Sequence, residues 1–411
     1  MFWDQKIETL DRAALERLQL KRLQETVRRV VAHVPFYRQK FAELGVMPED
    51  IRSLADLRRL PFTGNADLRA NYPTGLLAVP YDATLRLHTS SGTTGKPKAL
   101  FFSRQDVDNA AELCARSFVM TGITQKDVFQ NMMTYGMFTG ALVTHYGAEK
   151  VGCLVIPAGP GNSERQLMLM QDFRTTFIHL TPSYALYLAT FLEKHGVNPR
   201  RDLALRKAFV GAEAYTEETC RKIEDGLSVD VYNSYGLSEM NGPGIAFECE
   251  QKHGMHLWED HFLIEIIDPQ TGEPLPDGEA GELVMTTLTR EAMPLLRYRT
   301  RDITSLIPEP CRCGRTHRRP FGRHAHRARR EHLPAADRAR PDGAVGGGQK
   351  LSDRAGRPRR DDGQGGTGGS RFRGTGGAAH EIAEPSGREI ARGNPHQTTG
   401  PAPAARLAAG E

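Results

Sequence analysis

The most distinctive stretch of the sequence runs from residue 89 to residue 98: Thr89-Ser90-Ser91-Gly92-Thr93-Thr94-Gly95-Lys96-Pro97-Lys98. It places glycines, hydroxyl side chains and lysines together in one short segment. Backbone N–H groups and hydroxyls in such a segment can close around phosphate oxygens, and the lysines add positive charge. The order and spacing differ from those of a Walker A loop. The stretch predicts a phosphate-binding loop of another kind, with a plain flexible turn between strands as the alternative.

Strand-like and helix-like segments alternate on the C-terminal side of this loop. Helical periodicity predicts helices at 163–172 and 216–226. The short apolar runs predicted to be buried strands are Val151–Pro157, Thr176–Leu180, Ala208–Val210 and Val229–Tyr232. This alternation is typical of an α/β domain with a largely parallel sheet. A second β-rich portion is expected at 262–267 and 282–288, and amphipathic helices are expected at 8–45.

The chain as a whole has 411 residues and a net charge of +4, which is long enough for two or three domains with cores of their own. It contains no run of 18 apolar residues and no apolar segment near its start, so neither a transmembrane helix nor a signal peptide is predicted. Six cysteines are too few for a disulfide scaffold in a chain of this length. The expected location is therefore the cytoplasm.

Several motifs besides the loop resemble those of one protein family. In chain order they are Pro35-Phe36-Tyr37-Arg38, Leu60-Pro61-Phe62-Thr63, Asn71-Tyr72-Pro73, Gly211-Ala212-Glu213, Tyr235-Gly236-Leu237-Ser238-Glu239, Trp258-Glu259-Asp260 and Arg297-Tyr298-Arg299-Thr300-Arg301-Asp302. With the loop, they resemble the adenylate-forming (acyl-CoA synthetase) superfamily and, within it, the phenylacetate–CoA ligase family. The resemblance extends to about Arg319. It implies an α/β large domain, with a helical N-terminal part at 1–85 and the adenylate-forming core at 86–319.

The resemblance also implies a reaction. The carboxylate of an aryl acid such as phenylacetate attacks the α-phosphate of ATP, giving an acyl-adenylate and pyrophosphate, and the thiol of coenzyme A then displaces AMP. Charge gathers on the α-phosphate in the transition state, so fixed donors and Mg²⁺ are expected there. The expected partners are the aryl acid, ATP and coenzyme A, with no nucleic acid and no membrane. A homodimer and a place in the catabolism of aromatic acids are expectations from the resemblance alone.

Matching motifs residue by residue gives each candidate a role. Thr93, Lys98 and Glu239 are expected to be catalytic, and Glu239 also to hold Mg²⁺. The expected nucleotide-binding residues are Ser90, Ser91, Gly92, Thr93, Thr94, Gly95, Lys96, Gly211, Ala212, Glu213, Tyr235, Gly236 and Asp302. Tyr235 offers an aromatic face to adenine, and Asp302 offers two oxygens to the ribose hydroxyls. Each alone also fits an ordinary position, Tyr235 in a core and Asp302 as a helix cap.

The segment Tyr135-Gly136-Met137-Phe138-Thr139-Gly140 is apolar, aromatic and interrupted by glycines. It resembles the part of the family that walls the aryl group. The expected substrate-binding residues are Tyr135, Gly136, Phe138 and Gly140. An ordinary buried helix start is the alternative for any one of them.

Cysteines and histidines form a second constellation: Cys249, His253, His256, Cys311 and Cys313. The Cys-x-Cys-Gly segment can point two thiolates at one ion, and the Cys and His upstream can supply two further ligands. Relatives that resemble this pattern carry the histidine just ahead of Trp-Glu-Asp, which favours His256. The pattern predicts a structural Zn²⁺, and three reduced thiols without a metal are the alternative.

Two departures from the family pattern stand out. Asn65 occupies a position where a lysine is expected, and this difference is predicted to be minor. The larger departure begins near Pro320, where the family continues into a hinge and a small lid domain with a late lysine. From Phe321 to Glu411 the chain instead holds 18 of its 41 glycines and 15 arginines, without Tyr, Trp, Met or Cys. This segment has six more basic than acidic residues, so residues 1–320 are slightly acidic.

A shifted reading frame accounts for this segment. Each amino acid largely fixes the first two bases of its codon, so a +1 shift leaves only a few choices at each position. Residues 330–339 can then encode V-N-I-F-P-P-Q-I-E, which resembles a segment of the family's lid domain. Segments beginning at Lys350, Asp362 and Gly376 can encode two strands and a helix in the expected order. Residues 320–411 are therefore predicted to be an out-of-frame translation, and their composition predicts disorder.

The loss of the lid predicts an impaired ligase, because the chain cannot then close over the adenylate. One alternative is a catalytically defective protein that only binds nucleotide or acid. A more remote one is a zinc-knuckle nucleic-acid-binding protein with an Arg/Gly tail. The tail has only Phe321 and Phe372 to interleave with its basic residues, whereas single-strand binders use aromatic platforms. Nucleic-acid binding is therefore disfavoured.

Overall fold

The computed structural model describes residues 1–89 and 97–316, which fall within the unit Met1–Gly347. The predicted phosphate contacts at 90–96 and the predicted out-of-frame segment at 320–411 lie outside the described residues. Within the described part, no helix is both long and apolar enough to cross a membrane.

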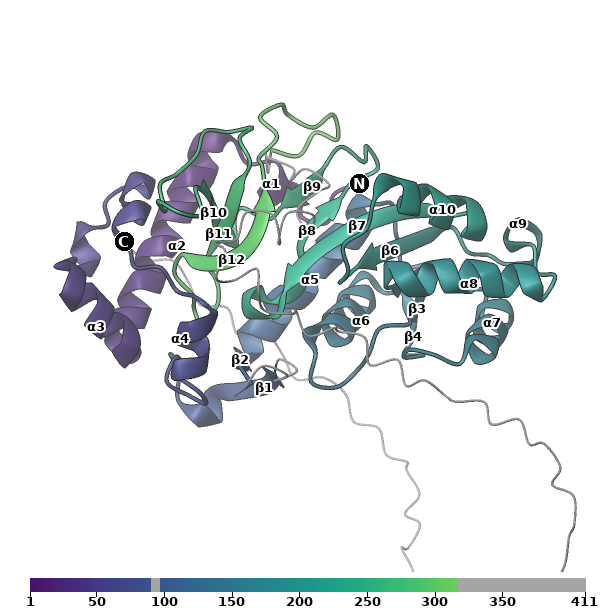
Figure 1. The fold of residues 1–411 in the computed structure, drawn as a ribbon, viewed down its shortest axis with the longest axis horizontal. Coiled ribbons are helices and arrows are strands. Elements are labelled where there is room, and N and C mark those ends of the chain that lie inside the picture. The colour runs from purple at the N-terminus through teal and green to yellow at the C-terminus, as the bar shows by residue number, and fades with distance from the viewer. Residues whose placement is uncertain (90–96, 317–411) are drawn as a thin grey trace, which may run out of the picture. The chain divides into compact units, whose positions relative to one another are not determined.

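The helical lead-in predicted at 8–45 is present (Figure 1). Its helices are α1 (Gln5–Glu8), α2 (Arg12–His33) and α3 (Pro35–Leu44), followed by the 3-10 turns Pro48–Asp50 and Leu54–Arg59, the helix α4 (Asn65–Ala70) and the 3-10 turn Tyr81–Ala83. Helix α2 begins where Asp11 accepts a hydrogen bond from the backbone of Ala14. Gly45 ends α3 in the left-handed conformation that glycine adopts at little cost.

A seven-stranded sheet forms the centre of the unit, with the strand order β4-β3-β5-β6-β7-β8-β9 (Figure 1). The strands from β4 to β7 are parallel, and β8 and β9 are antiparallel additions. The strands are β3 (Val128–Asn131), β4 (Leu154–Ile156), β5 (Phe177–Leu180), β6 (Lys207–Gly211), β7 (Asp230–Leu237), β8 (Gly242–Glu248) and β9 (Met255–Leu257). The predicted alternation and parallel sheet are confirmed. The strand predicted at Val151–Pro157 is shorter, because helix α6 includes Val151 and ends at Gly152 in the left-handed region.

Helices cover both faces of this sheet, which explains its continuous apolar runs. They are α5 (Arg104–Met120), α6 (Thr139–Val151), α7 (Ser163–Asp172), α8 (Pro182–Lys194) and α10 (Glu217–Leu227), and the short helix α9 (Pro199–Asp202) lies between α8 and β6 in the chain. Successive residues of a strand point to opposite faces. On β5 and β6, Phe177 and Phe209 pack on Phe118 of α5, whereas Ile178 and Ala208 join a separate cluster with residues of α8 and α10.

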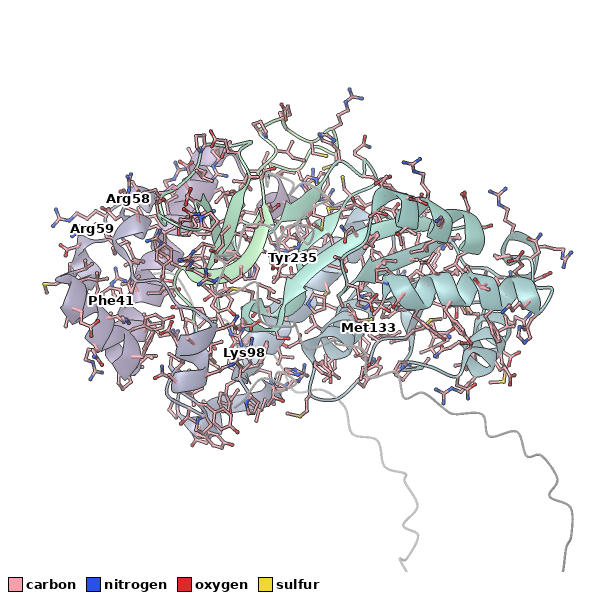
Figure 2. The ribbon with its side chains drawn as sticks, viewed as in Figure 1. Phe41, Arg58, Arg59, Lys98, Met133 and Tyr235 are labelled. Atoms are coloured by element: carbon pink, nitrogen blue, oxygen red, sulfur yellow. The ribbon has the colours of Figure 1, made fainter. Side chains whose placement is uncertain are left out.

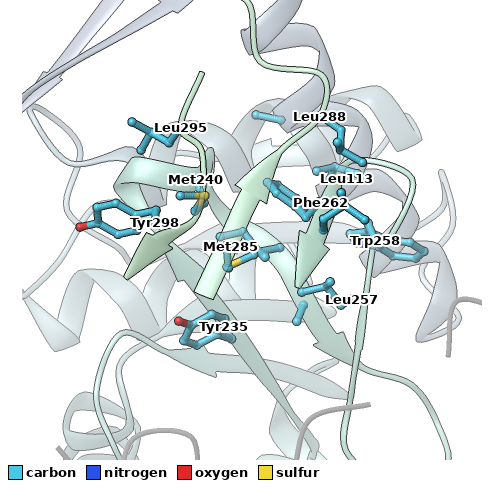
Figure 3. Packing of buried hydrophobic residues seen from close by; sticks show 14 of the residues in the cluster. Leu113, Tyr235, Met240, Leu257, Trp258, Phe262, Met285, Leu288, Leu295 and Tyr298 are labelled. Atoms are coloured by element: carbon cyan, nitrogen blue, oxygen red, sulfur yellow. The ribbon is translucent and has the colours of Figure 1, made fainter. Parts of the chain in front are cut away.

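Two smaller sheets complete the unit. The antiparallel pair β1 (Thr84–Thr89) and β2 (Ala99–Ser103) flanks the predicted phosphate loop. The three-stranded antiparallel sheet contains β10 (Phe262–Ile267), β11 (Gly281–Thr287) and β12 (Tyr298–Thr304). Figure 3 shows Phe262, Met285 and Tyr298 of this sheet in the same core as Trp258 and Tyr235. The second β-rich portion predicted from the sequence is confirmed.

Candidate active site

The predicted site residues gather where strands end. Gly211 ends β6, Tyr235 lies near the end of β7, and Glu239 follows in the 3-10 turn Ser238–Met240. Lys98 stands just before β2, and Asp302 is on β12. In open α/β sheets, ligands bind beyond the carboxyl ends of the parallel strands. Figure 2 shows Lys98, Met133 and Tyr235 in this part of the molecule.

A cavity of about 290 Å³ opens beside these strand ends. Its lining is formed by Met133, Thr134, Phe138, Thr139, Gly140, Ala141, His179, Ala212, Ser234, Gly236, Ser238, Gly242 and Pro243. It brings together the predicted acyl residues Phe138 and Gly140 with the predicted nucleotide residues Ala212 and Gly236. Burial lowers the pKa of His179 to about 4, so this ring is neutral near pH 7. The described lining therefore has no charged side chain.

The other two predicted acyl residues, Tyr135 and Gly136, are not among the described lining residues. The Tyr135 hydroxyl instead lies 3.0 Å from His145 Nδ1 and accepts a 3.0 Å hydrogen bond from Asn131 Nδ2. The segment 135–140 is attached to β1 through the Met137 carbonyl oxygen, which accepts hydrogen bonds from the Thr89 amide at 3.1 Å and from His88 Nδ1 at 3.1 Å. This attachment connects the acyl segment to the strand that leads into residues 90–96.

Lys98 and Glu239, both predicted to be catalytic, form a hydrogen-bonded ion pair. Glu239 is 6% exposed. Burial alone raises the pKa of its carboxyl, but the Lys98 ammonium, together with hydrogen bonds from Lys98 and Tyr298, outweighs burial and holds the pKa below its ordinary value. The carboxylate is thus ionised at neutral pH. The buried Arg290 guanidinium donates to the Glu239 backbone oxygen at 2.8 Å and to the Phe101 oxygen on β2 at 3.0 Å.

Tyr235 and Asp302 also meet, because the Tyr235 hydroxyl donates to Asp302 Oδ2 at 2.8 Å. Both side chains are buried, and the Tyr235 ring belongs to the core shown in Figure 3. The structure thus joins the residue predicted for adenine to the residue predicted for ribose. Asp302 lies within β12, so the alternative of a helix cap is wrong.

Gly211, Gly236 and Glu213 have local roles that the sequence did not indicate. A Cβ at Gly236 would lie 2.2 Å from the Gly242 oxygen, and one at Gly211 would lie 2.5 Å from Ser234 Oγ. Only glycine therefore fits at these two close approaches. The Glu213 carboxylate accepts from the Ser183 hydroxyl at 2.9 Å and from its amide at 3.2 Å, at the first turn of α8.

Sequence reasoning missed two residues of this site, Tyr298 and Arg290, and treated a third, Asn65, as a minor departure. Asn65 Oδ1 accepts hydrogen bonds from Lys98 Nζ and from the Tyr298 hydroxyl, each at 2.9 Å. Tyr298 also donates to Glu239 Oε1 at 3.2 Å. Tyr298 belongs to the same sequence motif as Asp302, and that shared motif was the available signal. Arg290 lies in none of the motifs.

The cysteine and histidine constellation comes together as predicted, with His256 and without the exposed His253. Cys249 follows β8, His256 is on β9, and Cys311 and Cys313 follow β12. The potential ligand atoms of these four residues all lie within 4.8 Å of one another. Cys249 and Cys311 Sγ are 3.6 Å apart, and two sulfurs bound tetrahedrally at about 2.3 Å to one Zn²⁺ would lie about 3.8 Å apart. The donor set therefore fits the metal.

Hydrogen bonding within this cluster divides its thiols into donors and acceptors. The pKa of Cys313 is lowered, chiefly by a hydrogen bond from the Cys249 thiol and also by His256. The same hydrogen bond, with burial, raises the pKa of Cys249. The other cysteines, Cys114, Cys153 and Cys220, are buried outside the cluster. Burial raises the pKa of the Cys153 thiol to about 12, so this thiol is protonated and unreactive at neutral pH.

Comparisons with known proteins agree with this geometry. Residues 17–289 match the family model described as AMP-binding enzyme. The chain is 50% identical over 318 residues to the phenylacetate-coenzyme A ligase of Thermus thermophilus, covering 77% of this chain and 71% of that one. It is 49% identical over 307 residues to the phenylacetate-coenzyme A ligase of Pseudomonas putida, covering 74% of this chain and 70% of that protein.

A solved structure shows the same fold. The open conformation of 2-hydroxyisobutyryl-CoA ligase, in complex with 2-HIB-AMP and CoA, superposes with a TM-score of 0.74 at 28% identity. The superposition covers 78% of this chain and 76% of that one. The predicted fold class is confirmed for the described residues.

Proposed function

Because the chain belongs to the phenylacetate–coenzyme A ligase family of AMP-binding enzymes, we propose that it activates an aryl carboxylic acid of the phenylacetate type. The reaction converts the acid to its coenzyme A thioester with ATP. The acid's carboxylate oxygen forms a bond to the α-phosphorus while the bond to pyrophosphate breaks. The coenzyme A sulfur then attacks the acyl carbon, AMP leaves, and the thiol proton passes to solvent.

The observation that carries the proposal for the acid is the uncharged cavity next to the Lys98–Glu239 pair. At about 290 Å³ it lies just below the ~300–1,000 Å³ range of small-molecule sites, so it suits a small ring. Phe138 and Met133 supply apolar contacts, and the neutral His179 adds no charge. A ring without charge can enter such a cavity without losing solvation that the lining cannot replace, whereas a second carboxylate cannot. The cavity thus favours a monocarboxylic aryl acid.

The nucleotide is proposed to bind with its phosphates near Lys98. The ammonium supplies one positive charge, and the Ser90–Lys96 stretch is the proposed source of backbone and hydroxyl donors. Glu239 presents an ionised, oxygen-donor carboxylate of the kind that Mg²⁺ prefers, and Mg²⁺ would there neutralise phosphate charge. The hydroxyl of Thr93 is proposed as a further phosphate donor. Adenine and ribose are proposed to bind on the Tyr235 and Asp302 side.

We further propose that the Cys249, His256, Cys311 and Cys313 cluster holds a structural Zn²⁺. Four protein ligands close a tetrahedral site and leave no position for a substrate. The ligands come from β9, from the end of β8 and from the segment after β12, so the ion would link these parts of the chain.

The proposed frame change near residue 320 has a functional consequence. A chain without the lid and its lysine is expected to bind MgATP but to form adenylate slowly. The matched stretches cover 77% of this chain and 71% of the T. thermophilus enzyme, which is compatible with a shared large domain and an unmatched remainder.

The deciding experiment compares this chain with a version in which the reading frame is restored near codon 320. Pyrophosphate release and thioester formation are measured with phenylacetate, acetate and phenylmalonate. Phenylacetate should be the best acid in both proteins, with far slower turnover in the chain as it stands. Equal turnover in the two proteins would exclude the impairment, and ATP binding without any turnover in either would favour the binding-only alternative. A preference for phenylmalonate would reject the uncharged acyl pocket.

A further inference from the structure

Asn65 belongs to a closed ring of four side chains beside the proposed phosphate site. The ring contains Lys98, Glu239, Tyr298 and Asn65, which come from four separate segments of the chain. Lys98 and Tyr298 are the donors, and Asn65 Oδ1 and Glu239 Oε1 are the acceptors. Each donor hydrogen-bonds to both acceptors. Nothing in the residue type of Asn65 indicated this place.

The orientation of the Asn65 amide follows from its neighbours. An ammonium can only donate hydrogen bonds, so the amide oxygen must face Lys98. The Tyr298 hydroxyl has one hydrogen, which is shared between Asn65 Oδ1 at 2.9 Å and Glu239 Oε1 at 3.2 Å. The ring therefore holds one positive charge, one negative charge and two neutral groups. Asn65 supplies the second acceptor without adding a second negative charge.

The backbone around Asn65 is fixed against the strand that carries Tyr298. Thr63 pairs with Tyr298 in a parallel bridge, and the Arg299 amide donates to the Thr63 oxygen at 2.9 Å. The Thr63 side chain donates to the Leu296 oxygen at 2.8 Å and lies 2.8 Å from the Tyr37 hydroxyl. A group held by such supporting contacts is pre-organised for its partners. Asn65 and Tyr298 thus form a fixed frame beside the ammonium of Lys98.

We propose that Asn65 is a positioning residue for the phosphates of ATP. It holds the Lys98 ammonium beside the Glu239 carboxylate, so that one cation and one anion stand ready for the nucleotide phosphates and their metal ion. A lysine at this position could accept no hydrogen bond from Lys98 and would place a second ammonium beside the first. The proposal rests on the proposed function, which puts the phosphates at this site.

The test is Asn65→Leu, which keeps a similar volume and removes the acceptor. Isothermal titration of the full chain is carried out with MgATP and, separately, with adenosine, which lacks phosphates. We expect MgATP to bind about tenfold more weakly to N65L, the order of one lost hydrogen bond to a charged group. Adenosine should bind with unchanged affinity. If Asn65 only supports the fold, N65L should bind both MgATP and adenosine more weakly, and that result would overturn the proposal.

Two further variants sharpen the test. Asn65→Asp keeps the acceptor and adds a negative charge, so it should weaken ATP binding more without Mg²⁺ than with Mg²⁺. N65L should weaken ATP binding by a similar factor with and without Mg²⁺. Asn71→Leu removes an asparagine from the other end of α4, where the amide donates only to the Asp67 backbone oxygen among its described partners, and should leave MgATP affinity within twofold.

The failures are distinguishable. If the unmodified chain binds neither MgATP nor adenosine, the proposed function fails. If it binds both and N65L binds MgATP equally well, the proposed function stands and the role of Asn65 is rejected. Unequal responses of N65L and N65D to Mg²⁺ support positioning of charge, and equal responses reject it.

Discussion

The polar ring at Lys98 and the cysteine–histidine cluster at Cys249 are built alike but could be foreseen to very different degrees. Each gathers four side chains from distant segments, and each lies beside the end of a strand of the central sheet. Thiolates and imidazole are uncommon, soft ligands whose spacing already points to a metal. Amide, phenol, ammonium and carboxylate groups occur everywhere on protein surfaces. A site made of rare ligand types can therefore be predicted from the sequence, whereas a site made of common polar side chains cannot, even when the two are equally well ordered in the structure.

The largest effect is expected from removing the cation of the ring. Lys98→Met leaves the buried Glu239 carboxylate without the ammonium that pairs with it and removes a positive charge from the proposed phosphate site. The rate of adenylate formation, measured as pyrophosphate release, should fall by about 100-fold or more, as when a transition-state donor is lost. The zinc content should not change. Lys222→Met is the matched control, because Lys222 pairs with Glu218 on the exposed face of α10. A rate for K98M within threefold of the control would remove Lys98 from the catalytic group.

An intermediate effect, on stability rather than on nucleotide, is expected from the other cluster. Cys313→Ser removes one of the four proposed zinc ligands, so metal content measured by atomic absorption should fall from about one zinc per chain towards zero. The melting temperature should drop by about 5–10 °C, the shift that a loss of a few kcal/mol gives in a domain of this size. MgATP affinity should stay within twofold.

Cys220→Ser is the control for this substitution, since Cys220 is buried on α10 outside the cluster. It should retain zinc whatever it does to stability. A zinc-free protein as purified from zinc-containing medium, with C313S melting at the same temperature, would reject the structural metal and favour the reduced thiols.

The smallest effect is expected in the pH dependence of stability, where the contribution of His179 in the cavity can be distinguished from that of the cysteine–histidine cluster. His179 is fully buried, and burial lowers its pKa to about 4, below the ordinary value of about 6.5. The unfolded chain therefore binds a proton at His179 more readily than the folded chain. The stability that His179 contributes is fully present above about pH 6.5 and is lost as the pH falls towards 4. Between pH 8 and pH 6 the loss from this group should be about 1 kcal/mol, measured by urea unfolding.

His179→Gln should flatten that decline, because the amide can replace the contact between His179 Nδ1 and Thr144 Oγ at 3.3 Å without titrating. Protonation of the cysteine and histidine ligands also costs stability at low pH, and that part should remain in H179Q and disappear in C313S. If the free energy of unfolding falls equally with pH in H179Q and in the unmodified chain, His179 does not contribute to the loss of stability.

Much of the fold could be predicted because local patterns and the final packing agree. Helical periodicity predicted helix 163–172 with the bounds of α7, and in the structure the Asn162 side chain caps this helix at the same residue. The boundary at Val151 was wrong because an apolar β-branched residue suits a strand as well as the last turn of α6. Gly152, in the left-handed conformation that ends the helix, decided between them.

The sequence predicts the α/β architecture, the family and the cysteine–histidine cluster, because periodicity, motif order and rare ligand types are properties of the chain. It also placed Lys98 and Glu239 in one site. Only folding shows that Asn65 and Tyr298 hold that pair, and that Tyr135 turns to His145 rather than to the cavity. Hydrogen bonds join atoms a few ångströms apart whatever their distance along the chain, so common polar residues gain their roles only when the chain has folded.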